Sequence, residues 1–155
     1  MKQNGFTLIE LMTAVAVLAL LMTMAVPSYR SFTATQRLRA ASFDLRTDLL
    51  LARSEALKRN TTVTIERRAS TGWKSGWTVK VDSSALELRA RNDVGTDVDV
   101  SVASSSITFN GSGRVSSPSG TVQFALTAST GSTDLARCIV LDASGMPKTY
   151  AEACS

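Results

Sequence analysis

Residues 5–27 read GFTLIELMTAVAVLALLMTMAVP, and this almost wholly apolar stretch decides how the rest of the chain is interpreted. As a helix, the 21 residues from Phe6 to Val26 would extend about 30 Å, the thickness of the hydrocarbon core of a bilayer. Because Lys2 precedes the stretch, the positive-inside tendency keeps the N-terminus in the cytoplasm and sends the bulk of the chain across. An ordinary secretory signal would have a shorter apolar region followed by an A-x-A cleavage site, and no convincing A-x-A pattern follows here. The stretch therefore predicts a membrane-spanning helix over residues 6–27.

Glu10 is an acidic residue inside this apolar helix. A carboxylate there costs about 2.5–3.5 kcal/mol on insertion scales, and such residues usually have a function. Glu10 lies one helical turn after Phe6, on the same face. If the chain were cut between Gly5 and Phe6, the new α-amino group would be a cation at the start of a helix, where an anion is favoured. The same carboxylate could reach the amine of an adjacent chain, a role that neither a secretory signal nor a plain membrane anchor explains.

A second helical segment follows Pro27 and is amphipathic. Pro27 removes a backbone donor and disfavours helix at the preceding residue, so a kink or local melting is expected there. Residues 28–60 then place apolar side chains at steps of three and four, on one face. This face consists of Leu38, Ala41, Leu45, Leu49, Ala52 and Ala56, and a basic stripe of Arg39, Arg46 and Arg53 runs beside it. The helix is expected to end near Asn60, where β-branched residues begin to alternate.

Residues 61–155 are rich in Ser and Thr and predict a series of short strands. The expected strands are Thr61–Arg67, Gly76–Val81, Ala85–Ala90, Val98–Val102, Ser106–Phe109, Thr121–Leu126 and Arg137–Leu141. The expected turns are Gly72–Ser75, Asn110–Gly113, Gly131–Asp134 and Ser144–Gly145. Pro147 limits any strand near it to a sheet edge. Because the amphipathic helix cannot bury its apolar face alone, the predicted fold class is α+β, with one long N-terminal helix packed on an antiparallel β-sheet.

The composition excludes most catalytic and metal-binding roles. The chain has no histidine, which is the commonest general base and metal ligand. It also lacks the G-x-S-x-G, S-x-x-K and phosphate-loop motifs, so we expect neither an enzyme nor a bound cofactor. Cys138 and Cys154 without histidine make a poor zinc site, so no metal is expected. A disulfide between them is the natural interpretation if the domain lies outside the cytoplasm, with two free thiols as the alternative.

The net charge of +4 is concentrated in one segment. Between Arg30 and Arg59, seven basic residues stand against three acidic ones, whereas from Asn60 onward there are nine of each. Any electropositive surface is therefore expected on the segment that follows the apolar stretch.

The N-terminal pattern resembles the type IV prepilin signature, in which Gly precedes Phe-Thr-Leu-Ile-Glu and an apolar helix. The resemblance implies that a prepilin peptidase cleaves between Gly5 and Phe6 and N-methylates Phe6. It also implies that residues 1–5 are a removable leader and that Glu10 guides subunit assembly. By this resemblance, the partners of the protein would be other pilins or pseudopilins and an inner-membrane assembly platform. The domain would lie in the periplasm, on the bacterial inner membrane, until the subunit joins a pilus or pseudopilus.

Four later motifs resemble, in their order and spacing, the GspH/FimT-type pseudopilin domain. They are LARSEALKRN (51–60), WKSGW (73–77), ITFNGSGRV (107–115) and RCIVLDASGMPK (137–148). This family supplies low-abundance minor pilins that prime the tip of a type IV pilus, and a related subunit belongs to the type II secretion pseudopilus. The loop between Cys138 and Cys154 resembles the minor-pilin pattern more, which favours a FimT/FimU-type minor pilin acting in pilus biogenesis and twitching motility. A GspH-like secretion pseudopilin is the alternative. Trp73 and Trp77 are interpreted as core or as covers at a sheet edge.

A third alternative is DNA binding, because some FimT-like pilins bind DNA through a basic C-terminal Gly-Arg-x-Arg motif. At the matching place this chain has Gly145-Met146-Pro147-Lys148, so only Lys148 is basic, with Arg137 nearby in sequence and acidic neighbours that offset both. Non-specific DNA affinity needs several cations, so this departure argues against strong DNA binding. The basic stripe of the helix (Arg39, Arg46 and Arg53) is a competing basic surface, interpreted as a solvated face or a subunit contact within the filament.

Overall fold

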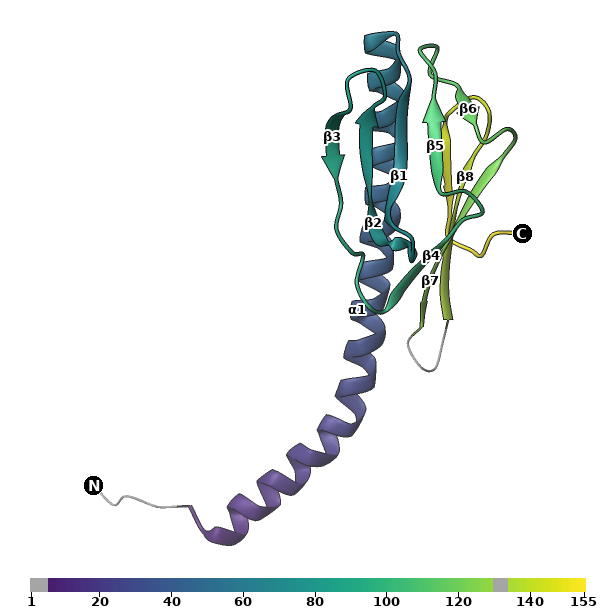
Figure 1. Cartoon of the computed structure of the whole chain (residues 1–155). Coiled ribbons are helices and arrows are strands. Elements are labelled where there is room, and N and C mark those ends of the chain that lie inside the picture. The colour runs from purple at the N-terminus through teal and green to yellow at the C-terminus, as the bar shows by residue number, and fades with distance from the viewer. Residues whose placement is uncertain (1–5, 130–133) are drawn as a thin grey trace. The chain divides into compact units, whose positions relative to one another are not determined.

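The computed structural model describes residues 6–129 and 134–155 and shows the predicted α+β fold (Figure 1). Within these residues one helix, α1 (Leu8–Arg59), is followed by nine strands. The chain divides into two compact units, one ending at Thr33 and the other comprising Ala34–Ser155. The boundary falls inside α1, so the same helix contributes to both units.

Helix α1 continues through Pro27 without interruption. The proline removes one backbone hydrogen bond, but the helical turns on either side keep their own backbone hydrogen bonds. The predicted local melting at Pro27 is therefore wrong, whereas a kink there stays a prediction. The helix ends where Asn60 adopts a left-handed conformation (φ 49°) and Thr61 donates its N–H to the Ala56 carbonyl at 3.3 Å. The predicted helix end near Asn60 is confirmed.

Two antiparallel sheets accompany α1 in the second unit (Figure 1). The first has the strand order β3-β2-β1-β5-β6 and the second has the order β4-β7-β8-β9. The strands are β1 (Val63–Ala69), β2 (Gly72–Val81), β3 (Leu86–Ala90), β4 (Val98–Ser101), β5 (Ser106–Phe109), β6 (Val115–Ser117), β7 (Val122–Ser129), β8 (Asp134–Leu141) and β9 (Pro147–Tyr150). The sequence indicated one sheet, not two. Alternation of polar and apolar residues identifies a strand but does not show which other strand it pairs with. Pairings such as Val63 with Phe109 join residues far apart in the chain.

The strand boundaries differ from the predicted ones at several turns. Strand β2 begins at Gly72, so the predicted turn at Gly72–Ser75 is part of a strand, and Ala69 pairs with Gly72 across the true reversal. Strand β6 was not predicted, because three residues carry too little alternation to identify a strand. The two longest strands of the second sheet, β7 and β8, extend beyond their predicted ends and pair along their full length. The predicted turn at Gly131–Asp134 falls on residues outside the described ones, except that Asp134 begins β8.

The second unit has one core, built from both sheets and the buried face of α1. The buried apolar residues of the helix are Ala34, Leu38, Ala41, Leu45, Leu49, Ala52 and Ala56, which confirms the predicted face. Trp73 and Trp77 are 2% and 1% exposed, so their interpretation as core residues is confirmed. The ring of Trp73 on β2 meets that of Phe124 on β7 edge-on, with centroids 5.3 Å apart. This contact joins the two sheets.

Candidate assembly and docking sites

Phe6, a predicted processing residue, lies two residues before α1, and Glu10, the predicted assembly residue, lies in its first turn. Phe6 is 92% exposed, and Gly5 lies outside the described residues. The backbone N–H and the hydroxyl of Thr7 both donate to Glu10 Oε2 at 2.8 Å, and the Thr7 hydroxyl oxygen accepts from the Glu10 N–H at 3.3 Å. This reciprocal pattern is a capping box, which satisfies backbone donors at a helix start. Sequence reasoning missed it, although T-x-x-E before an apolar run is its signature.

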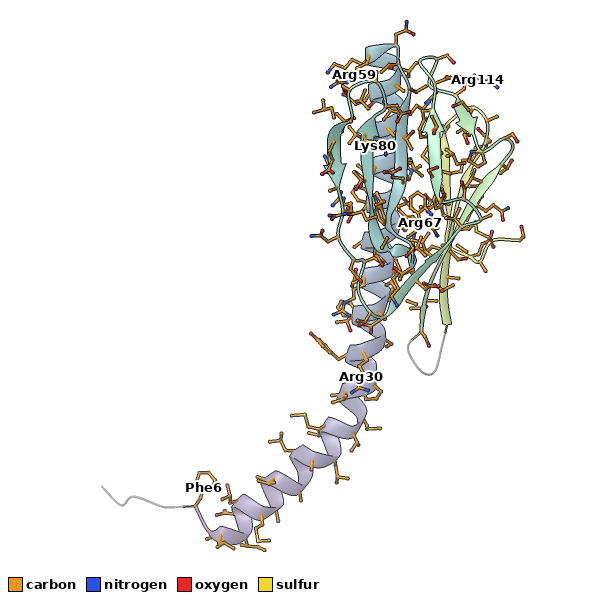
Figure 2. The ribbon with its side chains drawn as sticks, in the orientation of Figure 1. Phe6, Arg30, Arg59, Arg67, Lys80 and Arg114 are labelled. Carbon is orange, nitrogen blue, oxygen red and sulfur yellow. A yellow bond between two sulfur atoms is a disulfide. The ribbon has the colours of Figure 1, made fainter. Side chains whose placement is uncertain are left out.

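The first unit presents apolar side chains on all sides of α1 (Figure 2). Among the described residues up to Thr33, no side chain is buried, and Leu20 and Met24 are 69% and 78% exposed. By length and composition, α1 is long and apolar enough to cross a membrane. A helix that is apolar all round is stable only when lipid or other helices cover it.

Cys138 and Cys154 form a disulfide, with their Cα atoms 5.0 Å apart. Cys138 is a buried residue of β8, and Cys154 belongs to the tail that follows β9. The side chain of Gln123 on β7 also donates to the carbonyl of Ser155 at 3.3 Å. The tail is therefore fastened to the second sheet, and the predicted pairing of the two cysteines is present.

A cleft of about 860 Å³ lies between α1 and the strands β8 and β9. Four cations line it: Arg39 and Arg46 from α1, Arg137 from β8 and Lys148 from β9. Its other lining residues are Ser42, Phe43, Met146, Pro147 and Thr149. From the sequence, the helix stripe and the C-terminal cations are competing basic surfaces, and the structure places members of both in one cleft.

Arg53, the third member of the basic stripe, is engaged elsewhere. Its Nε donates to the carbonyl of Gly113 at 3.1 Å, and its Nη1 lies 3.1 Å from Met146 Sδ. Gly113 has a positive φ of 72°, and a Cβ built there would lie 2.8 Å from the side chain of Leu57. Arg53 therefore fastens α1 to the turn after β5 rather than pointing freely into the cleft.

Asp48 is a fully buried carboxylate on α1. Its Oδ2 accepts hydrogen bonds from Trp77 Nε1 and Arg91 Nε, both at 2.9 Å, and its Oδ1 lies 3.5 Å from Arg89 Nε. The hydrogen bond to Asp48 raises the pKa of the Arg91 guanidinium. Because a buried charge is tolerated only when it is paired, this cluster holds α1 against β2 and β3. Sequence reasoning missed it, since the partners of Asp48 lie far away in the chain.

Comparison with known families identifies the domain. The sequence model of a family described as type II transport protein GspH matches residues 41–145, well over half of the chain. The chain belongs to the GspH family. A second model, the prokaryotic N-terminal methylation motif, matches residues 1–26 of this GspH-family protein. Among curated proteins no relative matches it. The resemblance to GspH/FimT-type pseudopilins is thereby confirmed.

Two crystal structures of the type IV minor pilin FimU from Pseudomonas aeruginosa strain PAO1 are similar to the GspH-family protein. One has a TM-score of 0.63 at 24% sequence identity and covers 78% of this chain and 92% of the FimU chain. The other, in a different crystal form, has a TM-score of 0.64 at 23% identity and covers 76% and 97%. At this identity the likeness establishes the fold, a long N-terminal helix packed on antiparallel sheets.

Family membership also identifies the class of function. Pilins and pseudopilins are structural subunits, so the prediction that the protein is not an enzyme is confirmed. In the part of the chain that the structure describes, no group of three or more His, Cys, Asp or Glu residues could hold a metal ion. The candidate sites of the GspH-family protein are the start of α1, the apolar first unit and the basic cleft lined by Arg39, Arg46, Arg137 and Lys148.

Proposed function

We propose that this GspH-family protein is a minor type IV pilin that helps to initiate or cap pilus assembly and so contributes to twitching motility. The observation that carries the proposal is the first unit, an apolar helix that has Glu10 in its first turn and no buried side chain among its described residues. Such a surface is suited to lipid at first and to other helices later. The fold shared with FimU and the disulfide-fastened tail support a minor pilin.

The proposed sequence of events begins in the bacterial inner membrane. Lys2 stays in the cytoplasm, residues 6–27 span the bilayer, and the amphipathic segment 28–60 and the β-rich residues 61–155 lie in the periplasm. A prepilin peptidase then removes residues 1–5 and methylates the new N-terminus, as the match to the N-terminal methylation motif supports. An inner-membrane assembly platform transfers the processed subunit to other pilins.

Processing changes the surroundings of Glu10. The new α-amino group on Phe6 adjoins Thr7, whose N–H and hydroxyl hold the Glu10 carboxylate at the helix start. A carboxylate that is costly in an apolar helix becomes favourable when it pairs with the α-amino group of a neighbouring subunit. In this proposal Glu10 guides each subunit to its place, and the apolar helices then pack in the filament core.

Two variants separate docking from capping. Both variants break the capping box: Thr7→Ala removes the hydroxyl that accepts from the Glu10 N–H, but only Glu10→Ala removes the carboxylate. We expect Glu10→Ala to be nearly absent from pili sheared from the bacterium that carries it, and Thr7→Ala to be incorporated at close to the wild-type level. Immunoblots of the sheared pili measure this, and the near-ultraviolet circular dichroism of the tryptophans checks that the domain is folded. Normal incorporation of Glu10→Ala would contradict the proposal.

The second candidate is a subunit of a type II secretion pseudopilus, which membership of a family described as type II transport protein GspH favours. Deleting the gene separates the two candidates. If the protein is a minor pilin, the deletion should abolish surface pili and twitching and leave the secretion of exported enzymes normal. Loss of secretion with normal pili would instead assign the protein to the secretion machine.

A further inference from the structure

The basic cleft is a concentrated and largely unneutralised positive surface. Arg39, Arg46 and Arg137 have no hydrogen bond or ion pair from their side chains within the described residues. Lys148 has Asp142 at 3.7 Å, a pair whose two side chains are 61% and 40% exposed. Exposed pairs of this kind contribute little, so the cleft presents close to its full charge. Four like charges facing one cleft repel each other, and an anionic partner would relieve that repulsion.

The cleft is also partly apolar. Phe43 and Met146, which line it, are 65% and 48% exposed, and the buried Pro147 lies beside them. Apolar side chains of this size are usually covered in the functional state when they gather in a concave surface. The lining therefore suits a partner that carries carboxylates and some apolar side chains together.

One side of the cleft is the edge of a sheet. Strand β9 is the last strand of the order β4-β7-β8-β9 and has no strand on its outer side among the described residues. Its residues Pro147, Lys148 and Thr149 all line the cleft. The backbone groups on the free side of an edge strand can pair with an added extended segment.

We propose that this cleft binds an extended acidic segment of a partner subunit. The segment adds to the edge of β9, its carboxylates lie between Arg39 and Arg46 on one side and Arg137 and Lys148 on the other, and its apolar side chains cover Phe43. This surface belongs entirely to the second unit, so the proposal holds for either filament system and is independent of Glu10.

A polypeptide fits these observations better than nucleic acid does. A free sheet edge pairs with a peptide backbone, whereas a phosphate backbone cannot use it. Beyond Asn60 the chain has nine basic and nine acidic residues, and two of the nine basic ones are Arg137 and Lys148 of the cleft, so the cations of the cleft do not continue into a longer basic track. Nucleic acid binding without sequence preference relies on such a track.

The test uses the full chain in micelles of a non-ionic detergent and labelled short peptides. The probes are a peptide in which Glu alternates with Thr and Val, the same peptide with Gln in place of Glu, the Glu peptide N-methylated along its backbone, and a single-stranded oligothymidine. Fluorescence anisotropy gives the affinities. We expect the Glu peptide to bind at least about tenfold more tightly than the Gln peptide, because each carboxylate gains an ion pair. The N-methylated peptide should lose most of its binding, since it cannot pair with a strand edge.

Variants of the chain locate the binding site. Arg46→Ala combined with Lys148→Ala should weaken binding of the Glu peptide by about tenfold. Two exposed arginines outside the cleft, Arg67 and Arg114 (Figure 2), provide the control, because Arg67→Ala combined with Arg114→Ala removes the same charge and should leave the affinity nearly unchanged. Arg46→Gln alone, with a smaller loss, replaces the double variant if that variant does not fold.

Three results would overturn the proposal. Equal affinities for the Glu and Gln peptides would show that the cleft does not select carboxylates. Equal losses in the cleft and control variants would show that net charge and not the cleft is responsible. Tighter binding of oligothymidine than of the Glu peptide, lost in the cleft variants, would make the cleft a nucleic acid site. None of these results depends on whether the chain enters a pilus, so they leave the proposed function unaffected.

Discussion

The two parts of α1, before and after the boundary at Ala34, share a backbone conformation and differ in everything around it. From Ala34 onward nine residues of the helix are buried, and before it no described side chain is. The first part is apolar on every side, whereas the second is apolar on one face and basic on a neighbouring stripe. The difference shows that helix formation is local, while the distribution of apolar residues around the helix decides what covers it.

The two parts of the helix also differ in the surroundings of one carboxylate each, Glu10 in the first part and Asp48 in the second. Glu10 is exposed and is held by Thr7, a residue of its own helix turn. Asp48 is buried and is held by Trp77 and Arg91 from elsewhere in the fold. One carboxylate is therefore available to another subunit, and the other stabilises the subunit itself.

The largest expected effect comes from truncating one leucine in each part of the helix. Leu49 is fully buried, and Leu49→Ala should lower the free energy of unfolding of the domain by about 2–5 kcal/mol, because it leaves a cavity in the core. Leu18 is 55% exposed, and Leu18→Ala should leave that free energy unchanged. Denaturant unfolding of the full chain in non-ionic micelles measures both, because Trp73 and Trp77, the chain's two tryptophans, report on the second unit alone. Equal losses in the two variants would remove the distinction between the two parts.

The disulfide gives the next largest effect, and it should act on the second unit alone. Replacing Cys138 and Cys154 together by Ala should lower the free energy of unfolding of the domain by about 3 kcal/mol, since the unfolded chain regains the freedom of the closed loop. Reducing the wild-type chain should cause a similar loss, and the double variant should not respond to reductant. Insertion of the first unit into membranes should be unaffected in all of these samples. A wild-type domain equally stable with and without reductant would contradict the stabilising role of this bond.

The smallest effect compares the two carboxylates. Asp48→Asn keeps the shape of the side chain but removes its charge, and it should cost the domain about 1–3 kcal/mol because Trp77 and Arg91 lose a charged acceptor. Glu10→Gln should not change domain stability at all. Thermal unfolding followed by the tryptophan signal distinguishes the two variants, and a destabilised Glu10→Gln domain would show that the two parts are coupled.

The sequence predicted the helix, its buried face, its end near Asn60 and most of the strands, because these depend on the period and chemistry of neighbouring residues. The predictions fail where the local sequence pattern is weak or resembles that of another structure. The sequence placed a turn at Gly72–Ser75, inside what is the long strand β2, and it did not find the short β6. It allowed a kink or local melting at Pro27, and the melting is absent because a long helix tolerates the loss of one hydrogen bond.

The candidate sites divide in the same way. The residues at the start of α1 lie close together in the chain, so their local pattern, through its resemblance to prepilins, predicts Phe6 and Glu10 as processing and assembly residues, and T-x-x-E also encodes the capping box. Arg39 and Arg46 line the same cleft as Arg137 and Lys148, although the two pairs lie far apart in the sequence. No local pattern could predict that these cations come together. No local pattern could identify the role of Asp48 either. Its charge is typical of a solvated helix residue, whereas its surroundings are those of a core residue.

The sequence by itself determined the membrane-compatible helix, the family and the α+β class, because each follows from residue type and short-range spacing. The tertiary structure alone decided that the strands form two sheets, that Asp48 is a buried ion-pair partner and that two basic stretches line one cleft. The physical reason is that burial and charge clustering depend on contacts between distant segments, and those contacts are formed only when the whole domain packs.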